Sequence, residues 1–377
     1  MNDHASETAT KKLALIAVSV VTTLLMLEIG IRIHDTVRGW GFFYEGRNRT
    51  ARAEKAERPF RGFGFDAYRD RDAVRYIAST HGELYPFAKP EGTLRIVAFG
   101  GSTTVNEVSY KHGGGHYPLL LQSMIRERKG VDVEVINVAF SAYATPHSLI
   151  LLALDVINWD PDIVILSHNF NDLTIGYFPG FRPDYSHLYS NPFFRRNRSL
   201  VDSTFQHFQL YWLLRKGVRR VWREMTAVIL RESYGNEPPR EALEVFRRNL
   251  QSFVTLAKAN GIRVLLASQA LEPSEEYFTR HILPKLYNKM IYYPLHSEFL
   301  SHHHAYNRVI EEVALENGVW FLDNDRLFDG RSEFFTDFVH YSKPGVEKLA
   351  QNYADFLVER IGGADHASAA PRAALQE

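Results

Sequence analysis

The sequence contains no cysteine. This absence excludes disulfide frameworks, thiolate metal sites, cysteine nucleophiles and lipid anchors attached to cysteine. It does not identify the compartment, because chemistry built on Ser, His and Asp works in oxidising and reducing surroundings alike. Any targeting information must therefore come from the N-terminal sequence.

An excess of charge is also missing, because 44 Lys and Arg balance 44 Asp and Glu. Proteins that bind nucleic acids usually carry a basic excess, so we expect no nucleic acid as the main partner. The sequence has no Walker phosphate loop and no dinucleotide G-x-G-x-x-G after a strand, and we expect no cofactor. At 377 residues the chain is long enough to bury a sizeable α/β core.

An apolar segment near the N-terminus is expected to be a membrane anchor. Residues 13–27 carry no charge, and continuation to residue 33 gives about 20 residues, the length that crosses a bilayer core. Glu28 and Arg32 lie at i and i+4, so they can pair on one helix face near the membrane surface. The alternatives are a cleaved signal peptide, which lacks a clear cleavage site, and a buried amphipathic helix, which needs regularly spaced polar residues.

Beyond the anchor, composition and hydrophobic pattern divide the chain. Residues 34–90 are rich in Arg, Gly and aromatics and are expected to form a tether and a collar. Residues 91–362 alternate short apolar strands with helices, which predicts a three-layer, doubly wound, mostly parallel α/β sheet. An insert at about 176–238 is expected to hold a basic amphipathic helix at 211–231. Residues 1–12 form a polar tail, and 363–377 are expected to be disordered.

Five strands and five helices are expected in the main domain. The strands are 95–99, 133–138, 162–166, 263–267 and 319–322, and the helices are 117–129, 145–158, 241–260, 304–317 and 344–361. Because the carboxyl ends of parallel strands meet at one edge of the sheet, polar residues that follow these strands should gather there.

A glycine-rich turn with a serine follows the first expected strand. This places Ser102 at the carboxyl end of the strand, where open α/β sheets bind ligands. Gly100 and Gly101 permit a tight turn, and the next backbone N–H groups can point at a developing negative charge. Ser102 is therefore a candidate nucleophile, although a loop serine that caps a helix would fit the same short pattern.

A second pattern, near the C-terminus, can supply a base. Asp337 precedes His340 by three residues in a turn, so its carboxylate can bond Nδ1 of the imidazole. That bond leaves Nε2 to take the proton of a serine hydroxyl. An isolated D-x-x-H is equally typical of a surface turn or a pair of metal ligands, but together with Ser102 it predicts a catalytic triad.

Two further strand ends carry candidate oxyanion donors. Asn171 follows the strand at 162–166, and its amide can donate to an oxyanion, although Asn171 and Asp172 also fit a turn or a helix cap. Ala142 lies among small residues after the strand at 133–138, so its backbone N–H can approach a ligand. Asn137 is expected to hold this loop through bonds from its side chain to the backbone.

These four segments, in this order, resemble the four conserved blocks of the SGNH (GDSL-like) hydrolase family over about residues 94–361. The resemblance implies that Ser102 is the nucleophile, His340 the base and Asp337 its orienting acid. It also implies an oxyanion hole formed by the N–H groups of Ser102 and Ala142 with the amide of Asn171.

The sequence departs from the family pattern at three positions. G-G-S-T replaces G-D-S, Ala142 stands where Gly is usual, and Asn169 replaces the Gly of G-x-N-D. None of these changes removes a reacting side chain. Ala142 needs a φ that is compatible with its Cβ, and Asn169 is expected to add a polar side chain beside the site.

The resemblance implies a serine esterase, and the expected substrates are acetyl or other short acyl esters on cell-envelope glycans. An O-acyltransferase would use the same residues if a sugar hydroxyl replaced water. A lipid-directed esterase is favoured if residues 211–231 face a bilayer. A tethered binding protein without turnover is the non-enzymatic alternative, and the presence of every reacting side chain argues against it.

The orientation of the anchor follows from analogy. Lys11 and Lys12 precede the apolar segment and four arginines between 32 and 49 follow it, so the positive-inside rule does not favour export of the main domain. A short N-terminal tail with one anchor is nevertheless common among surface-acting hydrolases. We therefore expect a single-pass protein of a bacterial inner membrane with a periplasmic hydrolase domain.

The remaining conspicuous histidines are expected to be structural. His302, His303 and His304 point in different directions on a helix and lack carboxylates at ligand spacing, so no metal is expected. His168, beside the third block, is expected to make a supporting hydrogen bond.

Overall fold

The structure is a computed structural model of the whole chain. It describes residues 2–37, 42, 60–106, 109, 113, 115–178, 180–187, 238–282 and 295–361, together with 204, 205, 208–211, 213–215, 217, 218 and 221. The chain divides into two compact units, one of residues 1–55 and 192–232 and one of residues 56–191 and 233–377. The expected disordered tail at 363–377, most of the tether before residue 60 and much of the insert lie outside the described residues.

The first unit contains one long helix, α1 (Asn2–Val37). Its segment Lys11–Val37, 27 residues, is long and apolar enough to cross a membrane, as the sequence predicts. Among the described positions of the insert, 209–211, 213–215, 217 and 218 are helical, in agreement with the start of the expected helix. The rest of the range 211–231 lies largely outside the described residues.

An acidic side chain links these two helical segments. Glu28 accepts a 2.8 Å bond from Nε of Arg32, as the spacing predicts. Its carboxylate also accepts bonds from the backbone N–H groups of Gln209, at 3.0 Å, and Leu210, at 2.8 Å. A carboxylate is well placed at the first turn of a helix, where N–H groups lack partners within the helix. These donors explain how a buried acid is tolerated in an apolar helix.

The second unit is built on a five-stranded parallel sheet in the order β5-β4-β6-β7-β8. Its strands are β4 (Leu94–Gly100), β5 (Val133–Asn137), β6 (Ile163–Ser167), β7 (Arg263–Ala267) and β8 (Trp320–Leu322). Every residue of β4, β5 and β6 is buried, because helices cover both faces of the sheet. The chain runs from β4 to one edge and then returns past it to β6, so the topological switch point lies between β4 and β6.

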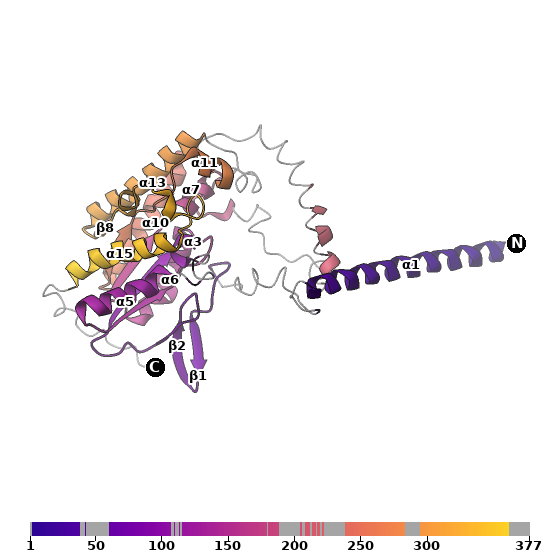
Figure 1. Cartoon of the computed structure of the whole chain (residues 1–377), viewed down its shortest axis with the longest axis horizontal. Helices are drawn as coiled ribbons and strands as arrows, with labels where there is room; N and C mark the ends of the chain where they lie inside the picture. The colour runs from indigo at the N-terminus through magenta and orange to yellow at the C-terminus, as the bar shows by residue number, and fades with distance from the viewer. Residues whose placement is uncertain are drawn as a thin grey trace. The chain divides into compact units, whose positions relative to one another are not determined.

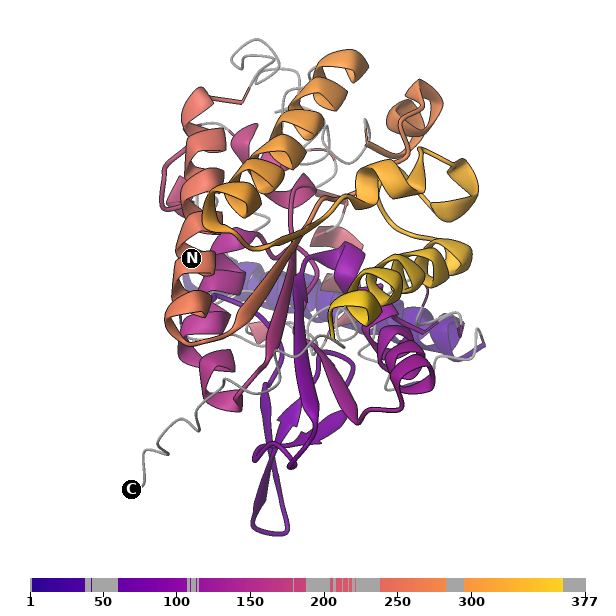
Figure 2. The same cartoon turned by 90° about the vertical axis from the view of Figure 1, so that its left-hand side faces the viewer.

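Helices cover the sheet in two layers (Figure 1 and Figure 2). One layer consists of α5 (Tyr117–Lys129) and α15 (Lys343–Arg360), which pack side by side over a core that includes Ile96 and Val135. The opposite layer consists of α6 (Thr145–Leu154), α10 (Arg240–Ala259) and α13 (His296–Asn317). There the ring of Phe99 meets that of Phe253 edge-on at 5.1 Å. The predicted three-layer, doubly wound α/β fold is confirmed.

Two helical segments differ in extent from the expected ones. The helical segment expected at 145–158 is divided, because α6 ends at Leu154 and a 3₁₀ helix, η1 (Val156–Trp159), follows. Helix α13 begins at His296 rather than residue 304, because the fully buried Phe299 extends its apolar face. The other short elements are α3 (Ser102–Val105), α7 (Phe170–Gly176), α11 (Glu275–Tyr277), η3 (Phe278–Ile282), α14 (Asn324–Phe328) and η4 (Ser332–Phe334).

The collar contains an antiparallel sheet that the sequence pattern did not predict. Its strands are β1 (Tyr68–Arg71), β2 (Val74–Ala78) and β3 (Leu84–Pro86). Strands β1 and β2 are joined through Asp72 and Ala73, whose φ angles are 52° and 61°. A two-residue hairpin with both φ angles positive usually has the sequence Asn-Gly or Asp-Gly, so the Asp-Ala pair does not identify this turn in the sequence.

Candidate active site

Ser102 is the first residue of α3 and directly follows the end of β4. Gly101 has φ −96°, so its role does not depend on a left-handed backbone. A Cβ at Gly101 would lie 2.5 Å from Nδ2 of Asn171 and 3.2 Å from the carbonyl oxygen of Tyr143. The glycine is therefore needed for space rather than for the tight turn that the sequence suggested, and it lets two loops meet beside Ser102.

The turn that carries Asp337 and His340 lies between η4 and α15. Oδ1 of Asp337 accepts backbone N–H groups from Val339 at 3.0 Å and from His340 at 2.9 Å. The N–H of Thr336 donates to the carbonyl of His340 at 2.8 Å and closes the turn. The Asp337 side chain thus fixes the backbone of the turn as well as its own orientation.

The structure brings Ser102, His340 and Asp337 together. Nε2 of His340 lies 2.8 Å from Oγ of Ser102. Nδ1 of the same ring lies 2.9 Å from each carboxylate oxygen of Asp337. The side chain of His340 is 28% exposed and that of Asp337 is 16% exposed, so the array is open to a substrate from one side. A serine, an imidazole and a carboxylate in this chain of hydrogen bonds can perform nucleophilic acyl transfer.

Asn171 lies beside this array, in the first turn of α7 after β6. Its Nδ2 donates a 2.7 Å bond to the carbonyl of Tyr143. This bond holds the amide against Gly101, whose absent Cβ makes the approach possible. Ser102 and Asn171 follow β4 and β6, the two strands at the switch point, where open α/β sheets bind ligands.

Ala142 occupies a turn between β5 and α6, and its φ is 68°. The N–H of Tyr143 donates to the carbonyl of Phe140 at 2.9 Å, so Ala142 is the third residue of a four-residue turn. A type II turn requires a positive φ at this position, which is why glycine is usual there. The Cβ is thus held in a region that L residues seldom adopt, at a cost of about 1–2 kcal/mol.

In the sequence Asp172 fits a turn or a helix cap, but in the structure it is a buried connection between two helices. It accepts the backbone N–H of Thr145 at 3.1 Å, the hydroxyl of Thr145 at 2.6 Å and the hydroxyl of Tyr185 at 2.8 Å. Burial raises the pKa of Asp172 to about 6, although these hydrogen bonds act in the opposite direction. Asp172 therefore ties the start of α6 to α7, beside the second and third sequence blocks.

Two expectations for supporting residues are confirmed. Asn137 donates to the carbonyl of Thr104 at 3.1 Å and accepts from the N–H of Ala139 at 3.1 Å, so it holds the loop after β5. His168 shares a 2.7 Å hydrogen bond with the hydroxyl of Ser148. Both are buried; Asn137 supports the loop after β5, and His168 is joined to helix α6.

Asn169 does not lie where the sequence suggested. Its side chain is fully buried, and Nδ2 donates to the carbonyl of His303 and to Oδ1 of Asn307 on α13. It therefore packs into the protein interior, against α13, rather than presenting a polar side chain beside the active site.

Sequence reasoning missed Gln269, which follows β7. Its Nε2 donates to the hydroxyl of Thr103 at 2.9 Å, and its Oε1 accepts the N–H of Phe170 at 2.8 Å. Gln269 thus connects the serine turn with the start of α7. Its position shortly after the predicted strand at 263–267, at the carboxyl edge of the sheet, is the feature of the sequence that could have identified it.

A carboxylate does lie near the histidine run, so the expectation that these histidines lack one at ligand spacing is wrong. Asp325, in α14 after β8, places Oδ2 3.3 Å from Nδ1 of His304. This proximity depends on the packing of α14 beside α13, which no local spacing reveals.

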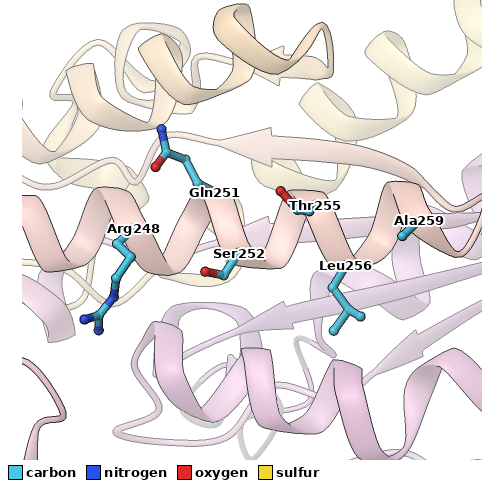
Figure 3. Close-up of a pocket in the computed structure, with 6 residues that line it drawn as sticks. All are labelled: Arg248, Gln251, Ser252, Thr255, Leu256 and Ala259. Atoms are coloured by element: carbon cyan, nitrogen blue, oxygen red, sulfur yellow. The ribbon is translucent and has the colours of Figure 1, made fainter.

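A surface hollow lies apart from these groups on one helix, α10. Figure 3 shows its six lining side chains, Arg248, Gln251, Ser252, Thr255, Leu256 and Ala259. None of the candidate catalytic or oxyanion residues lines it. The hollow therefore contributes no reacting group.

Two solved structures are similar to this chain at low sequence identity. An acetylxylan esterase from Geobacillus stearothermophilus, Axe2, is 15% identical over 70% of this chain and 93% of its own, with a TM-score of 0.41. A GDSL-like lipase from Bacteroides thetaiotaomicron is 15% identical over 71% of this chain and 88% of its own, with a TM-score of 0.37. No curated protein sequence matches significantly.

The sequence model of the GDSL-like Lipase/Acylhydrolase family matches residues 98–348. This range contains Ser102, Ala142, Asn171, Asp337 and His340, and it spans the sheet from β4 to the beginning of α15. The chain therefore belongs to the GDSL-like lipase/acylhydrolase family, the SGNH hydrolases, and is an enzyme that hydrolyses ester bonds.

Proposed function

We propose that the protein is a membrane-anchored serine esterase that removes acetyl or other short acyl groups from cell-envelope glycans. The observation that carries the mechanism is the 2.8 Å contact between Nε2 of His340 and Oγ of Ser102. In the first step His340 takes the hydroxyl proton while Ser102 attacks the ester carbonyl. The imidazolium then protonates the departing alcohol, and an acyl-enzyme remains. In the second step His340 activates a water molecule, which releases the acid and restores Ser102.

Asp337 orients the base in this proposal. Its carboxylate lies 2.9 Å from Nδ1 of His340, so the proton on Nδ1 is held there and Nε2 is left to accept. The same carboxylate stabilises the positive charge that the ring carries between proton transfers. The bonds that Asp337 accepts from the backbone of its own turn keep it in place during the reaction.

The oxyanion is assigned to three donors, which are the N–H groups of Ser102 and Ala142 and the amide of Asn171. Ser102 begins α3, and the first N–H groups of a helix lack partners within the helix. Asn171 uses one amide hydrogen for Tyr143, which leaves the second for substrate. The positive φ of Ala142 supports its assignment, because the family has glycine at this place.

The substrate and location rest on the anchor. Helix α1 can hold the hydrolase domain at a membrane surface, where acylated envelope glycans are within reach. We place the protein in a bacterial inner membrane with its hydrolase domain in the periplasm. Fusion of alkaline phosphatase, which is active only after export, to the C-terminus should give an active reporter. A cytoplasmic reporter would contradict this location.

One observation favours a lipid-directed esterase as the second candidate. Several apolar side chains of the segment that Glu28 joins to α1 are exposed, among them Phe208, Leu214 and Val218. Exposed apolar side chains beside an anchor helix suit a bilayer surface. In this case long acyl chains would be the better substrates.

Acyl-chain length distinguishes the two candidates. We would measure kcat/KM for p-nitrophenyl acetate, butyrate, octanoate and palmitate with the full chain in detergent, and acetate release from an O-acetylated polysaccharide. The proposal expects acetate to be the best acyl group and the polysaccharide to be deacetylated. A steady rise towards palmitate, without release of acetate from the polysaccharide, would contradict it. Addition of a sugar acceptor tests transfer, which would reduce free acetate and acylate the acceptor.

A further inference from the structure

A mixed cluster of histidine and carboxylate groups lies outside the proposed active site. His303 and His304 belong to α13, and Asp325 belongs to α14. One potential ligand atom from each of these residues lies within 4.8 Å of the other two. None of the three takes part in the proposed ester hydrolysis.

The imidazole of His303 has no hydrogen-bond partner among the described residues. The residue is fully buried, yet neither Nδ1 nor Nε2 forms a hydrogen bond there. Buried polar groups nearly always have a hydrogen-bond partner, because burial removes the hydrogen bonds that they form with water. An imidazole with two unused ring nitrogens therefore points to a ligand that the protein alone does not supply.

The remaining two groups already have the spacing of metal ligands. Nδ1 of His304 lies 3.3 Å from Oδ2 of Asp325. In a tetrahedral zinc site with bonds of about 2.0–2.1 Å, neighbouring ligand atoms are about 3.4 Å apart. No pair in the cluster is wider than 4.8 Å, so a modest closure would bring all three groups to one ion.

A neighbouring amide orients the carboxylate. Nδ2 of Asn307, one turn after His303 on α13, donates to Oδ2 of Asp325 at 3.1 Å. Groups that hold the ligands of a metal are as characteristic of such sites as the ligands themselves. The side chain of His304 is 56% exposed and that of Asp325 is 21% exposed, so an ion can enter from solvent.

From this arrangement we infer that His303, His304 and Asp325 form a binding site for a divalent transition metal, with Zn²⁺ as the best fit. Two imidazoles favour zinc over calcium or magnesium, which prefer oxygen ligands. Three protein ligands leave a fourth position for water.

The role of the site is structural. Asn307 also bonds the backbone of Gln269, accepting from its N–H and donating to its carbonyl, both at 3.1 Å. Gln269 in turn holds Thr103, next to the serine, through its 2.9 Å bond. A bound ion would thus stabilise the loops after β7 and β8, on which the Ser102 turn depends.

The test uses the full chain in detergent, purified without a polyhistidine tag and stripped with EDTA. Zn²⁺ is titrated by calorimetry, and Co²⁺ serves as a spectroscopic probe of tetrahedral coordination. The variants are His304→Ala and Asp325→Asn. The first changes an exposed side chain and the second keeps the size of the side chain, so both should preserve the core. His302→Ala is the control, because it removes an adjacent histidine outside the three ligands.

The inference expects one saturable Zn²⁺ site per chain, a higher Tm with Zn²⁺, and Co²⁺ absorption typical of tetrahedral sites. His304→Ala and Asp325→Asn should each weaken binding at least about tenfold, while His302→Ala binds like the wild type. The inference is wrong if the wild type shows no saturable binding. It is equally wrong if either ligand substitution leaves the affinity unchanged, or if His302→Ala removes it.

Discussion

Nε2 of His340 lies 2.8 Å from Oγ of Ser102, although 238 positions separate the two residues in the sequence. The fold fixes the positions of both residues. Ser102 is fixed by the end of the buried strand β4, and His340 by a turn in which the Asp337 side chain accepts its backbone N–H. Because each partner is held by its own backbone, substitutions of single reacting side chains should change catalysis more than folding.

Substitution of Asp337 by Asn should separate its catalytic and structural roles. The amide has the same size and can still accept a backbone N–H, so the free energy of unfolding should change by less than about 1 kcal/mol. Because the amide does not hold the His340 tautomer or offset its charge, kcat should fall on the order of 10⁴-fold. Steady-state kinetics with p-nitrophenyl acetate and urea denaturation measure the two effects.

Asp337→Ala serves as the comparison, since it also removes the acceptor of two backbone N–H groups. We expect it to lose a further 1–2 kcal/mol or so of stability. Activity of Asp337→Asn near the wild-type level would contradict the orienting role.

Replacement of Asn171 by Ala should remove an oxyanion donor. We expect kcat to fall about 10²–10³-fold while KM changes little, because the bond strengthens only as charge develops on the carbonyl oxygen. Asn171→Asp, which keeps the size of the side chain but lacks the donor, should be similarly slow. A kcat within about threefold of wild type in both variants would exclude Asn171 from the oxyanion hole.

Ala142→Gly should stabilise the protein. Relief of the positive φ gains about 1–2 kcal/mol, and the greater freedom of glycine in the unfolded chain returns about 0.5–1 kcal/mol. A net gain of about 1 kcal/mol in the free energy of unfolding, with activity retained, is the expected result of urea denaturation and ester assays. Ser141→Gly, at the preceding turn position where φ is not positive, should instead destabilise; equal effects would refute the strain at Ala142.

Acid should destabilise the folded chain between pH 6.5 and about 4. Burial lowers the pKa of His168 to about 3 and that of His147 to about 4. Unfolded histidines titrate near 6.5, so in this window the unfolded chain binds protons that the folded chain excludes. The free energy of unfolding therefore decreases as the pH is lowered. Asp172, whose pKa burial raises to about 6, acts in the opposite direction, because the folded chain takes up its proton first.

Burial also lowers the pKa of His303 to about 3, so three histidines against one carboxylate leave a net loss of roughly 2 kcal/mol per pH unit between pH 6 and 4. Urea denaturation at several pH values tests this slope. Asp172→Asn removes the opposing group and should make the loss steeper. A stability that is unchanged or rises on acidification would contradict the assignment.

Much of the fold could be predicted because β4, β5 and β6 are buried on both faces and read as continuous apolar runs between helical patterns. The roles of Ser102, Asp337 and His340 could be proposed for a related reason. Each lies at a strand end or in a short turn, so local spacing carried the information.

Other features depend on contacts that spacing does not encode. The hairpin at Asp72-Ala73 lacks the glycine that normally marks such a turn. The approach of Asp325 to His304 comes from the packing of two helices, and the backbone donors of Glu28 lie in a segment far along the chain. These contacts became visible only in three dimensions.

The most direct test of the esterase mechanism is the turnover of p-nitrophenyl acetate by the full chain in detergent, with Ser102→Ala beside the wild type. Ser123→Ala, an exposed serine on α5, is the matched control. The account expects Ser102→Ala to be slower by at least about 10⁴-fold and Ser123→Ala to equal the wild type. Equal rates for the wild type and Ser102→Ala would contradict it.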